Sequence, residues 1–318
     1  MKSCLVTGGA GFIGSHLAER IIDMGHEVII IDNESTGLYE NIPSKAVYIR
    51  GDVRDLDDLE QAFAHNLDVV FHIAGQASTI RSFNDPLGDL DVNVVGTINV
   101  VQKCLEHRVP RLLYASSMTA YGHPSELPIH EEMACCPVSY YGVTKYAAER
   151  YVHATALRND LDFPFHVTSF RMFNVYGERQ RIDNPYQGVM GIFIGNVIRN
   201  EPIIIHGNGE QSRDFIYISD VVDAWIQAWH NPTAYEQVFN LGTGRRHSIN
   251  QLADAILATF GNSRENYPVQ YAPLRPGDQR HMEADVAKTT RILEWQPQVS
   301  FANGVDRTAR WATGSKSS

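Results

Sequence analysis

The first 173 residues alternate between short continuous apolar runs and longer stretches in which apolar residues recur with a helical period. The short runs predict buried strands at residues 2–7, 27–31, 46–50, 69–72, 111–115 and 166–170. The periodic stretches predict helices at residues 15–24, 56–65, 87–108 and 141–158. Because strands that alternate with helices form a parallel sheet covered on both faces, the pattern predicts an α/β fold with a doubly wound parallel sheet.

The pattern changes after residue 173, where loops become rich in Gly, Pro and Asn. The elements predicted there are a helix at 192–199, a strand at 202–206, a helix at 218–229 and a strand at 238–241. We expect the last strand to return to the first sheet. The chain should therefore form two domains, residues 1–173 together with 237–250, and a smaller α/β domain over residues 174–318. The smaller domain should cover the carboxyl ends of the strands, where open α/β sheets bind their ligands.

The turn after the first predicted strand is rich in glycine. Its sequence, GGAGFIG, satisfies G-x-G-x-x-G at Gly9, Gly11 and Gly14, and also a G-x-x-G-x-x-G variant that begins at Gly8. Glycine lets the chain turn tightly and approach a pyrophosphate, and the N-terminus of the next helix favours anionic phosphates. A second strand that leads into Asp32 completes the order of elements that the motif requires. The segment predicts a Rossmann-type dinucleotide site.

Asp32 also indicates which dinucleotide binds. A carboxylate after the second strand accepts hydrogen bonds from the ribose hydroxyls and repels a 2′-phosphate. The next residues, Asn33 and Glu34, offer no cation for such a phosphate. NAD is therefore favoured over NADP.

Composition and charge exclude several classes of partner. The chain of 318 residues is 43% hydrophobic and carries a formal charge of −10 without a run of Lys or Arg, so neither nucleic acid nor an anionic membrane is expected as a partner. No apolar run approaches the ~18–20 residues of a membrane span, and we expect a soluble, cytoplasmic protein. Cys4, Cys104, Cys135 and Cys136 lack the spacing of a metal site or a disulfide framework, so no metal is expected.

The segment YGVTK places Tyr141 and Lys145 four residues apart, on one face of a predicted helix. A tyrosine that acts as a base at neutral pH needs its pKa of ~10 lowered by about three units, or about 4 kcal/mol. A nearby ammonium and the positive nicotinamide of oxidised NAD would lower it. Ser117 lies just past the predicted strand 111–115, at the carboxyl edge of the sheet, where a hydroxyl can bond a substrate oxygen and relay its proton. These three residues form a candidate catalytic set.

Many segments match one known family in the same order. They are GGAGFIG (8–14), IIIDN (29–33), GDVRD (51–55), FHIAGQAS (71–78), SSMTAYG (116–122), YYGVTK (140–145), FRMFNVYG (170–177), GNGEQSRDFIYISDV (207–221), FNLGTG (239–244) and RPGD (275–278). On these segments the chain resembles the extended short-chain dehydrogenase/reductase family, in its nucleotide-sugar epimerase/dehydratase branch. The resemblance covers nearly the whole length and implies NAD as cofactor and a UDP-sugar as substrate.

The resemblance also implies a role for each matching residue. Tyr141 would be the catalytic base, Lys145 would lower its pKa and hold the nicotinamide ribose, and Ser117 would bond the sugar 4-hydroxyl. The implied cofactor contacts are Gly8, Gly11, Phe12, Ile13, Gly14, Asp32, Asn33, Asp52, Val53, Ala74, Gly75, Asn93, Tyr141, Lys145 and Met172. The implied substrate contacts are Ser78, Ser117, Tyr141, Asn174, Val189, Ile204, His206, Arg213, Arg275, Asp278 and Met282.

The chemistry of the implied nucleotide contacts is consistent with those roles. The guanidiniums of Arg213 and Arg275 can neutralise a pyrophosphate, and the carboxylate of Asp278 can hold a ribose diol.

Two positions indicate the reaction. In the 4,6-dehydratases of this family an Asp-Glu pair follows the Ser/Thr, and the decarboxylases usually place a glutamate at the second of these positions. This chain has Met118 and Thr119, and its segment SSMTAYG resembles the 4-epimerases instead. We therefore expect Tyr141 to remove the 4-hydroxyl proton, through or beside Ser117, while hydride passes from C4 to NAD. The 4-keto sugar would then rotate and take the hydride back on its other face.

The sugar is less narrowly indicated. QASTIRSFNDP (76–86) resembles the corresponding segment of epimerases that accept N-acetylhexosamines. Met282, at the position that often gates the pocket, is neither the tyrosine of enzymes restricted to glucose and galactose nor a small residue. A UDP-N-acetylhexosamine is favoured, with UDP-glucose or UDP-galactose as the alternative, and UDP as the nucleotide rests on the resemblance alone.

Three other functions stay open. The chain could be a lyase such as a 5,6-dehydratase with a different acid/base set, or a dehydrogenase that releases a keto-sugar and NADH. A non-catalytic NAD-binding regulator belongs to another class and would not need Ser117, Tyr141 and Lys145. The resemblance further implies a homodimer in which the helices at 87–108 and 141–158 pair two subunits into a four-helix bundle. Otherwise the outer faces of these helices are solvated.

Overall fold

A seven-stranded parallel sheet forms the larger part of the molecule in the computed structural model, which describes residues 1–184, 186, 188–275 and 277–314. The strand order is β10-β6-β5-β4-β1-β2-β3, which is the Rossmann order with β10 added at one edge. The strands are β1 (Ser3–Thr7), β2 (Glu27–Asp32), β3 (Val47–Arg50), β4 (Val69–His72), β5 (Arg111–Ser117), β6 (His166–Met172) and β10 (Gln237–Leu241). The predicted fold class is therefore confirmed.

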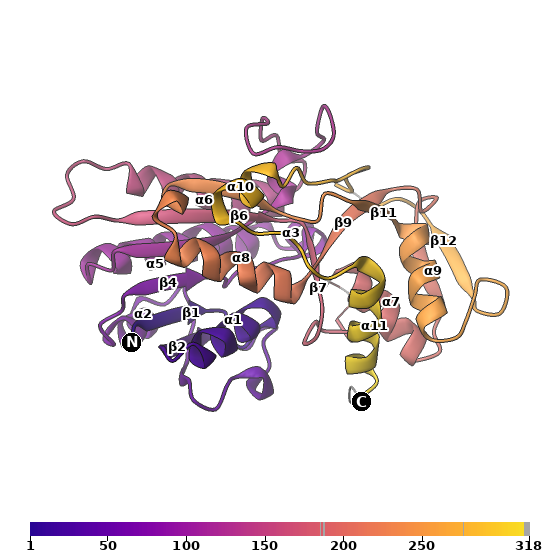
Figure 1. The fold of residues 1–318 in the computed structure, drawn as a ribbon, viewed down its shortest axis with the longest axis horizontal. Helices are drawn as coiled ribbons and strands as arrows, with labels where there is room; N and C mark the ends of the chain where they lie inside the picture. Colours follow the sequence, from indigo (N-terminus) through magenta and orange to yellow (C-terminus); the bar gives the residue numbers. More distant parts are fainter. Residues whose placement is uncertain (185, 187, 276, 315–318) are drawn as a thin grey trace.

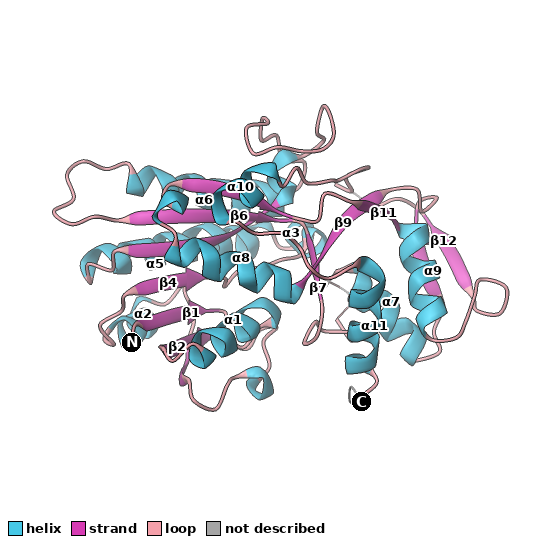
Figure 2. Ribbon diagram, in the orientation of Figure 1, coloured by secondary structure: helices cyan, strands magenta, loops and turns pink. Residues whose placement is uncertain are grey.

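Hydrophobic clusters cover both faces of the sheet. A strand can contribute to both clusters because successive side chains point to opposite faces. Cys4 and Val6 of β1 pack in one hydrophobic cluster, and Leu5 between them packs in the other. The first cluster contains residues of α1 (Phe12–Asp23) and α8 (Ile218–His230), and the second contains residues of α2 (Leu56–Phe63), α5 (Gly96–Glu106) and α6 (Tyr140–Ala156). Figures 1 and 2 show these helices around the strands. This burial explains why the strands are continuous apolar runs.

The predicted helix at 87–108 is interrupted in the structure. It consists of α4 (Pro86–Leu90), a π-helical turn η2 (Asp91–Val95) and α5, and a short helix α3 (Thr79–Asn84) precedes it. Such π-helical turns are frequent at functional sites. The turn contains Asn93, whose side chain is fully buried and faces α6 through Thr144.

The smaller part of the molecule contains two further sheets and several helices (Figure 1). In the three-stranded sheet, β9 (Ser212–Tyr217) pairs in parallel with β7 (Asn174–Tyr176) and antiparallel with β11 (Arg246–Ser248). The two-stranded sheet pairs β12 (Val269–Ala272) with β8 (Ile203–His206). The other elements of the region are α7 (Val189–Ile198), α9 (Ile249–Thr259), α10 (Ala287–Leu293) and α11 (Phe301–Ala312).

The chain passes between the two parts repeatedly. β10 pairs with β6, with Phe239 opposite Phe170, as expected for the strand at 238–241. α8 packs against α1, and α10 packs against β10, so these two helices also lie on the large sheet. The apolar pattern made no prediction for β7, β9, β11 and β12, which are short and carry polar residues, nor for α3, α9, α10 and α11.

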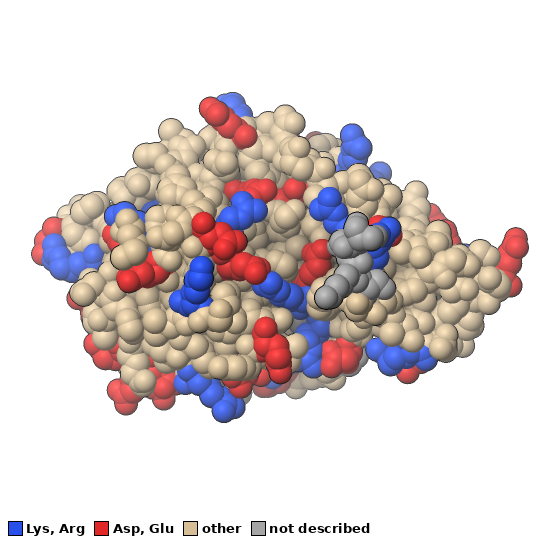
Figure 3. Space-filling model, turned by 60° about the horizontal axis from the view of Figure 1, so that its bottom comes forward, with Lys and Arg blue, Asp and Glu red and all other residues tan. Residues whose placement is uncertain are grey.

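Among the described residues, no helix has the length and apolar character needed to cross a membrane. Side chains of Lys and Arg are interspersed with those of Asp and Glu over the face of the molecule shown in Figure 3.

Candidate active site

A cavity of about 570 Å³ lies where the large sheet ends and the smaller part begins. Its wall contains residues at or just after the carboxyl ends of β1 to β6, and residues of the second part such as Arg213 and Asp278. Ligands of open α/β sheets bind at this edge, where the strand order reverses.

Most of the predicted site residues line this one cavity. The predicted cofactor contacts in its wall are Gly8, Gly11, Phe12, Ile13, Gly14, Asp32, Asn33, Asp52, Val53, Ala74, Gly75, Tyr141, Lys145 and Met172. The predicted substrate contacts in its wall are Ser78, Ser117, Tyr141, Asn174, Arg213, Arg275 and Asp278. Residues up to 270 positions apart in the sequence are thus brought to the same cavity.

Five predicted contacts lie elsewhere. Asn93 is fully buried behind the wall, where it bonds Gln76. Met282 is fully buried in a cluster with Met118 and Phe173, both of which line the cavity.

The other three belong to the smaller part. Val189 begins α7 directly after Gly188, a residue of the cavity wall. Ile204 is 43% exposed on β8, and the Nδ1 of His206 lies 2.9 Å from the Pro273 carbonyl oxygen at the end of that strand.

The glycine-rich turn forms a cradle that larger residues would fill. A Cβ atom on Gly14 would overlap the carbonyl oxygen of Gly8, and one on Gly8 would lie 2.9 Å from the backbone of Ala74. Gly8 also has a positive φ of 69°, which favours glycine. Gly11 precedes α1 and offers no side chain to cap its first N–H groups, so these remain available to an anion. The turn fits the pyrophosphate of a dinucleotide.

Two acids at the ends of neighbouring strands complete this half of the cavity. The Asp32 carboxylate accepts hydrogen bonds from the backbone N–H groups of Ala10 and Glu34, at 3.0 and 2.7 Å, and burial raises its pKa. Hydrogen bonding by the Arg54 guanidinium lowers the pKa of Asp52 to about 2. Asn33 also donates to Asp52, at 2.7 Å. The two backbone hydrogen bonds hold the Asp32 carboxylate at the end of β2, in the position that suits the adenosine ribose diol.

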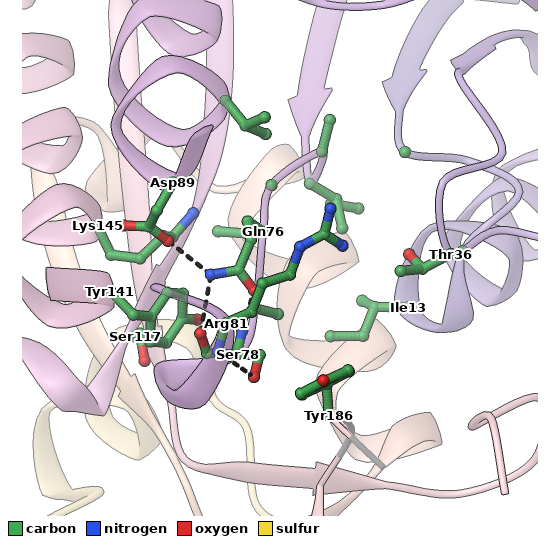
Figure 4. A pocket seen from close by; sticks show the side chains of 18 of the residues that line it. Ile13, Thr36, Gln76, Ser78, Arg81, Asp89, Ser117, Tyr141, Lys145 and Tyr186 are labelled. Carbon is green, nitrogen blue, oxygen red and sulfur yellow. Dashed lines mark hydrogen bonds between the residues drawn. The ribbon is translucent and has the colours of Figure 1, made fainter. Parts of the chain in front are cut away.

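The candidate catalytic residues come from a strand end and a helix. Ser117 is the last residue of β5, which ends two residues later than the predicted strand 111–115, and its Oγ accepts a hydrogen bond from the Thr119 hydroxyl at 2.9 Å. Tyr141 lies in the first turn of α6, which is capped by Ser139, and Lys145 follows one turn later. The Lys145 ammonium lies 4.5 Å from the centre of the Tyr114 ring. Figure 4 shows Ser117 and Tyr141 side by side at the cavity wall.

Burial sets the pKa values of both functional groups. It raises the pKa of Tyr141 to about 12, against a hydrogen bond with Ser117 that lowers it. It lowers the pKa of Lys145 to about 7, against the charges of Asp89 and Glu149, which raise it. The sequence predicts a lowered pKa for Tyr141, and the protein without cofactor does not produce it. Burial destabilises the phenolate more than the hydrogen bond with Ser117 stabilises it.

Of the polar residues behind this catalytic set, the sequence indicated Asn93 but did not single out Asp89. Asp89 of α4 is 1% exposed and accepts hydrogen bonds from Gln76 at 2.6 Å, Thr144 at 2.7 Å and Asn93 at 3.1 Å. Figure 4 shows Asp89 beside the Lys145 ammonium, with the bond to Gln76 dashed. The signal available in the sequence was an acid among the mostly apolar positions of the predicted helix at 87–108.

The opposite end of the site is cationic. Arg213 of β9 is nearly buried, pairs with Asp278 and donates to the carbonyl oxygen of Ser212 at 2.8 Å. Burial lowers the pKa of Arg213 and of Arg275, and the nearby Asp278 opposes this in both cases. The buried Oδ1 of Asn174 has no hydrogen-bond partner among the described residues. The two guanidiniums suit a phosphorylated ligand, and the unpartnered Asn174 Oδ1 can accept a hydrogen bond from a hydroxyl or N–H group of that ligand.

Comparisons with known proteins point to one family. The sequence model of the NAD dependent epimerase/dehydratase family matches residues 4–242. A UDP-glucose 4-epimerase of Mycolicibacterium smegmatis is 36% identical over 315 residues, which cover 96% of this chain and 97% of that protein. A UDP-N-acetyl-α-D-glucosaminuronate decarboxylase of Bacillus cytotoxicus is 30% identical over 321 residues, covering 98% and 97%.

Solved structures agree in fold over the whole chain. The crystal structure of a UDP-glucose 4-epimerase of Thermotoga maritima with UDP-glucose has a TM-score of 0.92 and 35% identity, and covers 98% of this chain and 99% of that one. The structure of a UDP-N-acetylglucosamine 4-epimerase of Methanobrevibacter ruminantium, in complex with UDP-N-acetylmuramic acid, has a TM-score of 0.88 and 30% identity, and covers 98% of each chain.

Proposed function

Because the chain belongs to the NAD-dependent epimerase/dehydratase family, we propose that it is an NAD-dependent 4-epimerase of a UDP-sugar. The observation that carries the proposal is the convergence of Ser117, Tyr141 and Lys145 with the glycine cradle in one cavity. Met118 and Thr119, which also line it, offer no carboxyl group for an elimination or a decarboxylation.

The glycine turn and Asp32 would hold the NAD pyrophosphate and ribose, and Tyr141 and Lys145 would face its nicotinamide end. NAD, when bound, supplies the acceptor and donor of the C4 hydride and a positive ring that favours the tyrosinate. The Ser117 hydroxyl binds the sugar 4-oxygen, and Tyr141 takes its proton and later returns it. Lys145 favours the deprotonated Tyr141 because a positive charge stabilises the phenolate.

We place the diphosphate of the substrate against Arg213 and Arg275, with Asn174 beside it, whose unpartnered Oδ1 would accept a hydrogen bond from a hydroxyl or N–H group of the substrate. Arginine binds phosphate oxygens with two parallel hydrogen bonds, and burial strengthens such contacts. One carboxylate oxygen of Asp278, Oδ1, pairs with Arg213, and the carboxylate can also accept a hydrogen bond from a ribose hydroxyl.

For the sugar, we favour a UDP-N-acetylhexosamine over UDP-glucose or UDP-galactose. The segment 76–86, which resembles that of N-acetylhexosamine epimerases, supplies Ser78 and several neighbours to the cavity wall. Met282 packs behind Met118 and Phe173, so its side chain does not take space from the cavity. The relative that binds UDP-N-acetylmuramic acid is consistent with a site that accepts N-acetylated sugars.

Proton NMR of the purified protein with UDP-N-acetylglucosamine, and separately with UDP-glucose, tests the activity and the sugar. We expect the anomeric signal of the galacto product without added NAD, at a higher rate for the N-acetylated sugar. Tyr141→Phe should lower the rate at least ~100-fold, since general-base catalysis contributes about that much. Tyr39→Phe is the control, since Tyr39 is 66% exposed and lies outside the cavity wall and the helices at 87–108 and 141–158.

Other outcomes would replace this function. Alkene or keto-sugar signals would make the protein a dehydratase, and accumulation of NADH would make it a dehydrogenase. A Tyr141→Phe variant with near wild-type turnover would refute the mechanism. NAD binding with no turnover of either sugar would favour a regulator.

We also propose that the protein is a homodimer joined through the α4–α5 and α6 region. Exposed apolar side chains gather on these neighbouring segments, namely Leu87, Leu90, Val95, Tyr140, Val143 and Tyr151. An apolar surface of this kind is suited to a second copy of the chain. Light scattering after gel filtration at micromolar concentration should give the dimer mass, and Val143→Glu should give the monomer. A monomeric wild-type protein would refute this assembly.

A further inference from the structure

The Asp89 carboxylate is buried among neutral groups. Its three hydrogen bonds come from the side-chain amides of Gln76 and Asn93 and from the Thr144 hydroxyl. A buried carboxylate without a cationic partner in contact is costly, and burial raises the pKa of Asp89 accordingly, while Lys145 lowers it. The acid is therefore retained at a cost in stability, which calls for a role in the site.

The Lys145 ammonium is the complementary case. It is 4% exposed and lies over the Tyr114 ring, and no carboxylate forms a direct ion pair with it in the described part of the chain. The acid that raises its pKa most is Asp89, followed by Glu149. Glu149 is already neutralised by Arg171, whose Nη2 lies 2.6 Å from its Oε1. Asp89 is thus the acid whose charge is left to balance Lys145.

Among the described residues, the acids whose charges act on the ammonium are Asp89 and Glu149, and the remaining neighbours are neutral. Tyr141 lies on the same helix and Tyr114 on β5, and burial raises the pKa of both phenols. His72 of β4 is fully buried between the hydroxyls of Thr7 and Thr97, and its pKa is lowered to about 3 by burial, so it stays neutral.

The same carboxylate connects two functional segments. Thr144, which donates to Asp89, precedes Lys145 on α6. The Gln76 side chain, which also donates to Asp89, donates to the Ser78 carbonyl oxygen at 2.8 Å and accepts from the Ser78 N–H at 2.5 Å. The loop that carries Ser78 and the helix that carries Lys145 are therefore fixed to one acid.

We propose that Asp89 is a positioning residue that balances the charge of Lys145 from a short distance without contacting it, and that aligns the loop at 76–78 with α6. Asp89 then raises the charged fraction of Lys145 in a buried cavity, while the N–H groups of Lys145 remain available to the cofactor ribose and to the Tyr141 phenolate. This inference rests on the role of Lys145 in the proposed function.

The proposal predicts how the reaction depends on pH. Removing a negative charge lowers the pKa of every group near it, and Asp89 raises the pKa of both Lys145 and Tyr141. The acid limb of kcat, set by deprotonation of Tyr141, and the alkaline limb, set by deprotonation of Lys145, should therefore move in the same direction. In Asp89→Asn both limbs should lie about one pH unit lower, which is at the low end of what a nearby charge does to a pKa.

The pH profiles of four proteins test this. Asp89→Asn has nearly the same shape, and its amide can bond the same neighbours. Asp89→Glu keeps the charge and should keep both limbs at wild-type pH even if kcat falls. Asp91→Asn removes a partly exposed acid from the adjoining turn and should leave the profile unchanged. If Asp89→Asn lowers kcat without moving either limb, the role of Asp89 is structural and the proposal is wrong.

A second measurement does not depend on the reaction. Urea unfolding of the NAD-free wild type, Asp89→Asn, Lys145→Met and the double variant forms a double-mutant cycle. We expect the two substitutions to be coupled by at least about tenfold in the unfolding equilibrium constant, because each single variant leaves one buried charge unbalanced. Coupling below twofold would overturn the proposal. If the wild type shows no epimerisation, the proposed function fails while this cycle still decides whether Asp89 and Lys145 interact.

Discussion

Replacing Glu149 by Gln should destabilise the protein more than most single substitutions. Glu149 and Arg171 form a buried pair whose side chains are 1% and 6% exposed. Arg171 Nη2 and Nε donate to the two carboxylate oxygens at 2.6 and 3.0 Å, and the Ser116 hydroxyl donates to Glu149 at 2.6 Å. Through Ser116 and Arg171, Glu149 therefore connects α6 to the last residues of β5 and β6, next to Ser117 and Met172.

The expected magnitude follows from what remains after the substitution. Glutamine keeps the volume of Glu149 but removes its charge. The buried Arg171 cation is then left with neutral acceptors, the new amide oxygen and the Glu131 carbonyl oxygen at 3.1 Å, and without its carboxylate. Breaking a buried pair in this way costs about 3–5 kcal/mol. The double variant Glu149→Met/Arg171→Met removes both charges and should cost much less, because no uncompensated charge remains. The exposed pair of Arg158 and Asp160 gives the contrast, since Asp160→Asn should leave the free energy of unfolding nearly unchanged.

Urea unfolding at pH 7, followed by circular dichroism and tryptophan fluorescence, measures these free energies. Glu149→Gln should lose several kcal/mol relative to wild type, and the double variant should recover most of that loss. Two results would refute this reasoning: a single variant within about 1 kcal/mol of wild type, or a double variant less stable than the single. Either would show that an unpaired buried cation is not the cause of the destabilisation. A lower kcat of folded Glu149→Gln would show that the pair also aligns Ser117 with α6.

Three further outcomes are expected. Gly14→Ala should purify with much less NAD than wild type, since its Cβ would overlap the Gly8 carbonyl oxygen. Gly25→Ala, whose Cβ would meet no neighbour but whose φ of 84° is strained for alanine, should be less stable than wild type and still keep its NAD. Equal NAD content of Gly14→Ala and wild type, measured by chromatography after denaturation, would contradict the cradle. In NAD-free protein the folded-state pKa of Lys145 is about 7, below its usual 10.5, so between these values the unfolded state binds more protons and stability should rise with pH. The unfolding free energy of wild type minus that of Lys145→Met should therefore become more positive from pH 7 to pH 10. A value that does not change with pH would refute the lowered pKa of Lys145. Arg213→Met should raise KM for the UDP-sugar at least ~10-fold with a smaller change in kcat, because a charged hydrogen bond to phosphate is lost. An unchanged KM would show that the diphosphate does not bind at Arg213.

Local sequence was sufficient for the features that depend on near neighbours. The apolar runs predicted each of the seven strands of the large sheet, because a strand buried on both faces needs apolar side chains at every position. The glycine turn was predictable because the backbone at Gly8 and Gly14 leaves no room for a Cβ atom. Tyr141 and Lys145 share a face of α6 by helical period alone.

Other features depend on residues that only the fold brings together. The contact between Asp89 and Thr144 joins positions 55 residues apart, and its place beside Lys145 follows from how α4 packs on α6. Met282 was predicted as a gate, and its burial behind Met118 and Phe173 depends on the packing of three separate segments. The return of α8 and α10 to the large sheet likewise reflects which apolar faces meet, which the period of a single helix does not specify.

The sequence by itself thus determined the class of fold, the dinucleotide turn and the identity of the candidate catalytic groups, because these follow from side-chain type and short-range spacing. The tertiary structure decided the protonation of those groups. Burial raises the pKa of Tyr141 to about 12 and lowers that of Lys145 to about 7, and Asp89 acts on both. A pKa reports the free energy of a charge in its surroundings, and those surroundings are made by elements far apart in the chain.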